Sequence, residues 1–302
     1  MHPGIAAMQE QLEREAYVTD RAVATALYLA ATLEKPLLVE GPPGVGKTEI
    51  AKVLARARGA DLIRLQCYEG LDANTALYEW NYPKQLLRIK LDESAASSHG
   101  AALPVEAREA SIFSEPFLLK RPLLQAITHQ GVSPVLLIDE IDRADEEFEA
   151  FLLEVLSDFQ VTIPEIGTIR AQVRPSVVLT SNRTRELSEA LRRRCLYLWI
   201  DYPSLEKELR IVRAKVPAAS ARLAQETVTF IHAVRRFALD KSPGVAETLD
   251  WAAALVALHA DALDESIVRE TLGCVVKDER DLRHLNDELD AGHLAAMLSL
   301  AS

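Results

Sequence analysis

Cysteine is scarce in this sequence, and the few cysteines that occur form no recognisable pattern. Among 302 residues there are three, Cys67, Cys195 and Cys274, and none belongs to a C-x-x-C pair. An odd number of cysteines far apart in the sequence argues against a disulfide framework and offers no zinc-binding spacing. The seven histidines also lack H-x-x-x-H spacing. We therefore expect reduced thiols and no structural metal site.

Long apolar runs are missing as well. The longest uncharged apolar run covers residues 22–33, which is shorter than the ~20 residues that a bilayer-spanning helix needs. Residues 1–8 lack a basic region followed by an apolar core, and Glu10, Glu13 and Glu15 follow closely. That is not the pattern of a secretory signal. The sequence thus predicts a cytoplasmic protein without membrane insertion.

Positive charge is in deficit. Lys and Arg number 34 against 45 Asp and Glu, which gives a net charge of −11. Such an acidic surface disfavours unspecific attraction to nucleic acid or anionic lipid, so we expect protein partners and no nucleic acid. Hydrophobic residues make up 49% of the chain, enough for sizeable cores. At ~150 residues per domain, the length predicts about two domains.

A glycine-rich loop is the most informative segment that is present. Residues 41–48 match G-x-x-x-x-G-K-[ST] at every fixed position. A short apolar strand, 35–40, precedes this loop, and a helix with apolar residues at helical spacing follows it over 48–58. Strand, glycine loop and helix together form a P-loop, which binds a nucleoside triphosphate. The predicted nucleotide-binding residues here are Gly41, Pro42, Pro43, Gly44, Val45, Gly46, Lys47, Thr48 and Glu49.

The chemistry of a P-loop assigns roles to several of these residues. Glycines let backbone N–H groups turn inward around the phosphates, and the helix N-terminus adds positive potential. Lys47 would pair with the phosphates, and the Thr48 hydroxyl would ligate Mg²⁺. Upstream, Tyr17 and Val18 lie between two predicted helices, 9–16 and 20–33. They are candidates for a wall of the adenine pocket, and packing between the two helices explains them equally well.

Two carboxylates end a second apolar strand. The run 135–140 is typical of a buried strand and ends in Asp139 and Glu140. Asp139 suits Mg²⁺, directly or through water, and Glu140 suits the general base that polarises the attacking water. An Asn-Lys-x-Asp guanine-reading segment is absent, and a nucleotide kinase would need no glutamate directly after the metal aspartate. We therefore predict a Mg²⁺-dependent ATPase with ATP as its nucleotide.

Two further polar segments are candidates for catalysis. Asn182 ends a predicted strand, where its amide could hydrogen-bond the γ-phosphate or the water, although a strand-end Asn is also a common turn residue. Arg192, Arg193 and Arg194 end a short helix, where they either compensate the helix dipole or reach a neighbouring subunit's ATP as an arginine finger. The acidic residues between 142 and 149 are expected to be solvated and to compensate a helix dipole.

The order of the predicted elements indicates an α/β fold followed by helices. Strands at 61–67, 135–140, 177–182 and 196–201 join the strand before the P-loop, whereas only helices follow residue 203. We predict an α/β nucleotide-binding domain over 1–203 and a helical lid with a C-terminal tail over 204–302. Inside the first domain we expect an insertion at about 76–120 and a β-hairpin at about 160–174. The insertion is expected to be flexible at 92–102, with helices from about 105 and 122, and the polar segment from 277 is expected to fray.

Together these motifs resemble an AAA+ ATPase of the MoxR family. The resemblance covers residues 17–276 and rests on the segments 41–48, 137–140, 180–182 and 189–194. The runs CYEGLD at 67–72, DEIDRAD at 139–145 and LRRRCL at 191–196 are similar to the CoxD-like branch of that family. That branch is associated with maturation of the molybdenum–copper carbon monoxide dehydrogenase.

The resemblance implies a P-loop AAA+ core with a five-stranded parallel sheet, in which the strand ending at Asn182 lies between the P-loop strand and the strand of Asp139. It also implies an all-helical lid, a homo-oligomeric ring of six subunits, and Arg194 as the arginine finger. Relatives commonly act with a von Willebrand factor A domain protein to remodel a client metalloenzyme or to load metal into it. The implied function is ATP-driven remodelling or maturation of a client. A nucleotide-switched binding scaffold with slow hydrolysis is the alternative.

One departure from the family bears on the choice between client remodelling and a nucleotide-switched scaffold. Relatives often have Ser-Pro-Arg at the start of a lid helix, where the arginine senses the γ-phosphate. Here the matching residues are Ser242, Pro243 and Gly244, so the arginine is missing. Either another residue such as Lys241 replaces it, or the lid couples weakly to the nucleotide. Weak coupling would favour the scaffold.

Overall fold

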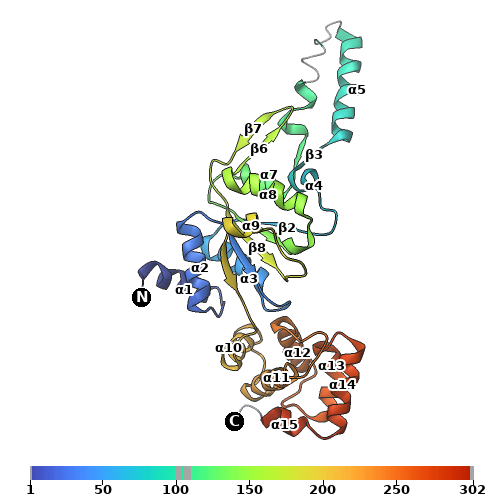
Figure 1. Cartoon of the computed structure of the whole chain (residues 1–302). Coiled ribbons are helices and arrows are strands. Elements are labelled where there is room, and N and C mark those ends of the chain that lie inside the picture. Colours follow the sequence, from blue (N-terminus) through green and yellow to red (C-terminus); the bar gives the residue numbers. More distant parts are fainter. Residues whose placement is uncertain (1, 100–103, 105–109, 300–302) are drawn as a thin grey trace. The chain divides into compact units, whose positions relative to one another are not determined.

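A five-stranded parallel sheet forms the centre of the fold (Figure 1). The computed structural model describes residues 2–99, 104 and 110–299. The strand order is β2-β5-β8-β1-β9, which confirms that the strand before Asn182 lies between the strand of the P-loop and that of Asp139. The strands are β1 Leu37–Glu40, β2 Leu62–Gln66, β5 Val135–Asp139, β8 Ser176–Ser181 and β9 Leu196–Trp199.

The residues of the central strands explain their place in the sheet. β1 and β5 are buried along their whole length, and β8 is buried from Val177 to Ser181. Nearly continuous apolar runs of this kind are typical of parallel strands that are covered on both faces. The register pairs Gln66 of β2 with Asp139 of β5, so polar residues of neighbouring strands meet at the carboxyl edge of the sheet.

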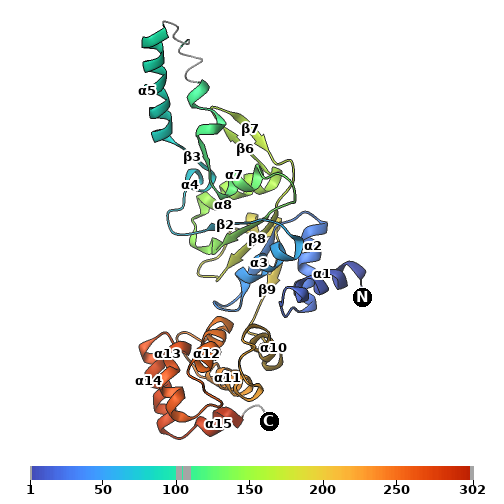
Figure 2. The same cartoon turned by 180° about the vertical axis from the view of Figure 1, so that it is seen from behind.

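Helices α7 (Pro122–Ile127) and α8 (Glu146–Asp158) build the larger core together with the sheet. Both views of the fold show these helices between the sheet and α5 (Figures 1 and 2). The predicted apolar stripe of α8 is confirmed, since its residues Phe148, Leu152, Val155 and Leu156 are buried. Helix α9 (Glu189–Arg194) packs against α8 and adds Leu191 to the same core.

The insertion between β2 and β5 is more helical than the sequence predicts. Its short strands β3 (Tyr78–Trp80) and β4 (Leu118–Lys120) pair antiparallel, and helix α5 (Tyr82–His99) follows β3. The predicted flexible loop at 92–102 is therefore wrong as far as His99, because alanine and serine are tolerated in a helix. Residues 100–102, and the start of the helix predicted from 105, lie outside the described residues. A helix α4 (Ala73–Leu77) and a 3₁₀ turn η1 (Glu115–Phe117) complete this region.

The hairpin predicted at 160–174 is confirmed. Its strands, β6 (Gln160–Ile163) and β7 (Gly167–Arg170), pair antiparallel with Ile163 opposite Gly167. Gly167 has a φ of +96°, which an L-residue with a side chain rarely adopts, so glycine suits the tight turn at the start of β7.

The helices before and after the P-loop strand are α1 (Pro3–Arg14), α2 (Arg21–Thr32) and α3 (Lys47–Arg58). Helix α1 begins at Pro3, earlier than the predicted residue 9. Proline suits the first position of a helix, and the His2 ring accepts a hydrogen bond from the Gly4 N–H group. These local contacts, rather than apolar periodicity, set the start of the helix.

The C-terminal region is helical as predicted, but its end is better packed than expected. Its first helices are α10 (Leu205–Lys215), α11 (Ala221–Val234), α12 (Val245–Ala257) and α13 (Glu265–Val275). Two more follow, α14 (Glu279–Asp290) and α15 (Leu294–Ser299), where the sequence predicts fraying. The prediction is wrong because Leu285 and Leu289 of α14 are buried in the same core as Trp251 of α12.

The chain separates into two compact units. One comprises the residues up to Thr25, the segment Glu40–Val53 and the residues from Trp199 onward, and the other comprises Ala26–Val39 and Leu54–Leu198. The P-loop thus belongs to the unit of the C-terminal helices. The predicted domains 1–203 and 204–302 stay a prediction. Within the part of the chain that the structure describes, no helix has the length and apolar character that crossing a membrane requires.

The packing of α14 leads to a test of this corrected C-terminus. Replacing Leu285 with alanine should lower the free energy of unfolding by ~2–5 kcal/mol, as for other fully buried leucines. The matched control is Arg283→Ala on the exposed side of the same helix, which should change it little. Urea denaturation of both variants measures the difference. Equal stabilities would mean that the helix is frayed, as the sequence first suggests.

Candidate active site

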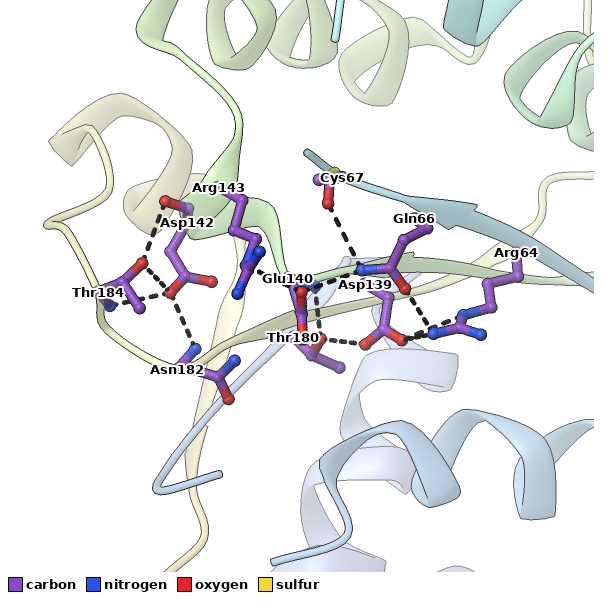
Figure 3. Close-up of polar contacts among 10 residues, drawn as sticks. All are labelled: Arg64, Gln66, Cys67, Asp139, Glu140, Asp142, Arg143, Thr180, Asn182 and Thr184. Atoms are coloured by element: carbon purple, nitrogen blue, oxygen red, sulfur yellow. Dashed lines mark hydrogen bonds and ion pairs between the residues drawn. The ribbon is translucent and has the colours of Figure 1, made fainter. Parts of the chain in front are cut away.

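The carboxylate of Asp139 and the backbone of Glu140 are held together by one hydroxyl group (Figure 3). Thr180 of the neighbouring strand β8 donates its hydroxyl hydrogen to Asp139 Oδ1 at 2.5 Å. The hydroxyl oxygen of Thr180 also accepts a hydrogen bond from the Glu140 N–H group at 2.9 Å. Thr180 is buried, so both bonds are shielded from water. The carboxylate of Asp139 and the backbone of Glu140 are therefore fixed relative to β8.

A second strand completes the surroundings of Asp139. The residue is only 2% exposed, and its Oδ2 accepts hydrogen bonds from Arg64 of β2, 3.1 Å from Nε and 2.6 Å from Nη2. Arg64 is about half exposed, so the charge of the ion pair reaches the surface. A buried carboxylate requires such compensation, because an unpaired charge in the interior is very costly.

Glu140 stands in an unusual backbone conformation with its side chain accessible. Its φ and ψ are 55° and 49°, a left-handed conformation that is uncommon for residues with a side chain and clusters at functional sites. Its Oε2 accepts a hydrogen bond from Gln66 Nε2 at 3.1 Å and lies 3.1 Å from Arg143 Nε. With 35% of the side chain exposed, the carboxylate remains open to a water molecule.

Arg64 and Gln66 are functional neighbours that the sequence does not reveal. Both lie on β2, for which the sequence predicts a strand and nothing more, and Gln66 also accepts a hydrogen bond from Arg64. The one available signal is their spacing of two residues, which places them on the same face of a strand. The register of β2 against β5 then brings that face to Asp139 and Glu140.

The acidic residues after Glu140 correct the expectation that they are solvated. Asp142 is buried, and its Oδ2 accepts hydrogen bonds from the backbone N–H groups of Asn182 and Thr184 and from the Thr184 hydroxyl, at 3.2, 2.9 and 2.7 Å. Asp142 thus ties the turn after β8 to the turn after β5. Asn182 takes part through its backbone, and its side chain points away from Asp142 (Figure 3).

Glu149 and Asp145 have structural roles of the same kind. Glu149 is fully buried, forms an ion pair with Arg185 and accepts a hydrogen bond from the Ser188 N–H group at 2.8 Å. Asp145 caps α8 by accepting from the Phe148 N–H group at 2.8 Å. The expected compensation of the helix dipole therefore applies to Asp145. The expectation that Asp142 and Glu149 are solvated is wrong, because both are buried.

Cys67 lies beside this cluster without taking part in its chemistry. Burial raises the pKa of its thiol to about 12, and the charges of Asp139, Asp142 and Glu140 add to the effect. The thiol is therefore protonated at neutral pH and is not a nucleophile. Its backbone N–H group donates to the Asp139 carbonyl at 2.9 Å, which extends the pairing of β2 with β5.

The P-loop has the backbone of a phosphate cradle. Gly44 and Gly46 have φ values of +76° and +92°, which other residues rarely adopt. Gly41 is required for a different reason, since a Cβ atom there would lie 2.0 Å from the Ile200 carbonyl oxygen. Lys47 is 7% exposed, and its amine donates to the carbonyls of Gly41 and Pro42 at 2.8 and 2.6 Å. Thr48 and Glu49 lie in the first turn of α3.

Tyr17 and Val18 lie between α1 and α2, as predicted, and both are half-buried. Burial raises the pKa of Tyr17, and the charges of Asp20 and Glu49 raise it further, so its hydroxyl is neutral. The influence of Glu49 places Tyr17 near the start of the P-loop helix. Both interpretations of this pair, adenine pocket wall and packing residue, remain predictions.

The three arginines of α9 have different surroundings. Arg193 pairs with Glu189 at 2.7 Å on the same helix, and the Arg192 guanidinium lies 5.6 Å from the centre of the Tyr197 ring. Arg194 is exposed and donates to Ser157 Oγ at 3.2 Å. Strand β9 starts two residues later, where the Leu196 N–H group donates to the Pro36 carbonyl before β1. Arg194 therefore lies at the amino edge of the sheet, whereas Asp139 ends a strand at the carboxyl edge.

Comparison with known proteins identifies the family. Residues 37–199, more than half of the chain, match the ATPase family associated with various cellular activities (AAA). An uncharacterized protein of Staphylococcus epidermidis is 24% identical over 259 residues, 82% of this chain and 87% of that protein. An uncharacterized protein of Staphylococcus haemolyticus is 23% identical over 269 residues, 85% of this chain and 90% of that protein. The chain belongs to the AAA ATPase family, and membership implies that it binds a nucleotide.

A solved structure with a similar arrangement is the RuvB Holliday junction branch migration motor of Thermotoga maritima. It is 20% identical, with a TM-score of 0.46, and the match covers 91% of this chain and 71% of that chain.

The bridging hydroxyl of Thr180 leads to a prediction about stability. Thr180→Val should remove the hydroxyl that donates to Asp139 and accepts from the Glu140 N–H group, at a cost of about 1–3 kcal/mol in the free energy of unfolding. Thr162→Val is the control, because that hydroxyl is exposed on the hairpin. Urea unfolding of both variants gives the comparison. A Thr180→Val protein as stable as the control would show that the bridge contributes little.

Proposed function

We propose that this protein is a MoxR-type AAA+ ATPase that couples ATP hydrolysis to remodelling or metal-cofactor maturation of a client enzyme. The observation that carries the ATPase part is the pair Asp139–Glu140, fixed by Thr180 at the carboxyl end of a central parallel strand. Ligands of open parallel sheets bind at that edge. The chain also supplies a P-loop whose glycines have the backbone conformation that phosphate binding needs.

The residues fit a Mg²⁺ ion. Carboxylate and hydroxyl oxygens are the ligands that this hard cation prefers, and Asp139 and Thr48 supply one of each. The Asp139 carboxylate already forms an ion pair with the guanidinium of Arg64, which supports its role as a cation ligand. When bound, Mg²⁺ neutralises charge on the phosphates. Lys47 and the N–H groups of the P-loop are proposed to hold the phosphates.

Glu140 acts as the general base in this proposal. Its carboxylate is accessible enough to accept a proton from a water molecule, while Gln66 and Arg143 orient it. Asn182 is proposed to hydrogen-bond the γ-phosphate or the water. The anchoring of its backbone by Asp142, and its side chain directed away from that anchor, support this assignment.

Arg194 is proposed as an arginine finger that acts on the ATP of a neighbouring subunit. Its position at the opposite edge of the sheet from Asp139 supports action between subunits rather than within one. The ring is proposed to contain six copies, and AAA ATPases commonly form rings. A von Willebrand factor A domain partner and a carbon monoxide dehydrogenase client rest on the resemblance of the sequence motifs alone.

A nucleotide-switched scaffold with slow hydrolysis is the second candidate, and Gly244 in place of an arginine favours it. Turnover measured with and without the client separates the two functions. Capture of partners on the Glu140→Gln ring with ATP, followed by mass spectrometry, identifies the client to be used.

The role of Glu140 gives a direct prediction. Glu140→Gln should bind ATP with unchanged affinity and lose at least ~10²-fold in kcat, as expected for a lost general base. Glu147→Gln, an exposed glutamate in the first turn of α8, is the matched control and should keep full activity. Phosphate release and equilibrium ATP binding are the two measurements. Turnover close to that of the control would remove Glu140 from this role.

The role of Arg194 is tested by mixing subunits. Arg194→Ala alone should lose ~10³-fold in ATP turnover, because the transition-state charge loses its partner. Adding the inactive Glu140→Gln subunit should restore part of the activity, since it brings an intact Arg194 next to an intact Glu140. Arg193→Ala should stay near the wild-type rate, because Arg193 pairs with Glu189 on its own helix. If no mixing ratio of the two variants restores ATP turnover, the result argues against an arginine finger that acts between copies.

A further inference from the structure

The lid helix α12 begins directly on the P-loop. The Val245 N–H group donates to the Gly44 carbonyl at 2.9 Å, and the Ala246 N–H group reaches the same oxygen at 3.3 Å. Val245 is the first residue of α12, so these are two of the N–H groups that no carbonyl of the helix itself can satisfy. The P-loop therefore supplies the acceptor for the start of the lid helix.

The contact leaves no room for a side chain at position 244. A Cβ atom on Gly244 would lie 2.6, 2.8 and 2.9 Å from the Cα, carbonyl carbon and oxygen of Gly44. These neighbours are backbone atoms, which cannot turn aside as a side chain can. The φ of Gly244 is −86°, a value open to any residue, so space and not backbone conformation demands glycine here. An arginine at this position would separate the two glycines.

Hydrogen bonds within the C-terminal helical region fix the position of Gly244 against Gly44. Glu247 accepts a hydrogen bond from the Gly244 N–H group at 2.9 Å and closes the first turn of α12. Arg235 donates from Nε to the Pro243 carbonyl at 2.8 Å, and its guanidinium forms two further bonds with the fully buried Glu208. The loop before α12 is thus anchored to α10 and α11 rather than left flexible.

We propose that Gly244 and the first turn of α12 position the P-loop for the nucleotide. A P-loop binds phosphate when its N–H groups point inward, so its carbonyls must point elsewhere. The hydrogen bonds from Val245 and Ala246 keep the Gly44 carbonyl turned toward the lid. The lid thereby stabilises the phosphate-binding form of the loop. This inference rests on the proposed function, in which the P-loop binds ATP.

The sharpest test removes the donor without harming the helix. Val245→Pro deletes the N–H group that donates to the Gly44 carbonyl, and proline suits the first position of a helix. We expect the Kd of a fluorescent ATP analogue to rise about tenfold, a change of ~1.4 kcal/mol in binding free energy. Glu265→Pro at the same position of α13 is the control, and its Kd should stay within about twofold.

A second pair of variants tests the close approach itself. Gly244→Ala should also raise the Kd about tenfold, whereas Gly273→Ala should not, because Gly273 lies in α13 with open space around its Cα. Melting temperatures of all four variants distinguish positioning from unfolding. A positioning role raises the Kd and the KM for ATP while the melting temperature and the kcat at saturating ATP change little.

The outcomes separate this inference from the proposed function. ATP binding by the wild type together with unchanged Kd values for Val245→Pro and Gly244→Ala would overturn the inference and leave the ATPase intact. A rise in Kd that follows a fall in melting temperature would overturn it as well. Failure of the wild-type chain to bind ATP would overturn both.

Discussion

The buried carboxylate of Asp139 is the constraint on which the arrangement of the sheet depends. A charge that is 2% exposed is stable in the interior only when neighbours supply hydrogen bonds and an opposite charge. Thr180 of β8 and Arg64 of β2 supply them from either side, so β5 has to lie between these two strands. A register shift of one residue would turn both partners to the other face. The order of the strands therefore decides which polar side chains surround Asp139 at the edge of the sheet.

In the C-terminal helical region, Glu208 is a second buried carboxylate that needs partners. Burial raises the pKa of this carboxyl group, but hydrogen bonds from His232, Arg235 and Thr248 outweigh burial, and its pKa is lowered. Because the folded-state pKa lies below the unfolded value, the group stabilises the fold above the unfolded pKa and loses this effect as the pH falls. The same Arg235 holds the Pro243 carbonyl, so the ion pair also fixes the loop that carries Gly244 to the P-loop.

Local motifs made much of this protein predictable, and distant partners account for most of the rest. The P-loop, the strand ending in Asp139 and Glu140, and the hairpin are contained in short continuous segments, which is why their patterns predict them. The sequence does not reveal the role of Arg64, because its partner Asp139 lies 75 residues away and only strand register brings the two together. The sequence predicts a frayed tail at helix α14 because its apolar residues are few, although Leu285 and Leu289 are enough to bury one face. The sequence shows a glycine at position 244, but not its contact with Gly44, which lies 200 residues earlier in the chain.

The geometry of the sheet also bears on the proposal that one copy of the chain is not a complete enzyme. Strands β5 and β9 contain five and four residues, so the two edges of the sheet are separated by roughly 13–17 Å at ~3.3 Å per residue. An arginine side chain does not span that distance, and Arg194 precedes β9 at the amino edge. If Arg194 serves a γ-phosphate at all, the phosphate belongs to another copy. Such a contact joins different surfaces of two copies and closes only as a ring. In that ring, the glycine contact would link the P-loop to the lid within a subunit, and the arginine would link one subunit to the next.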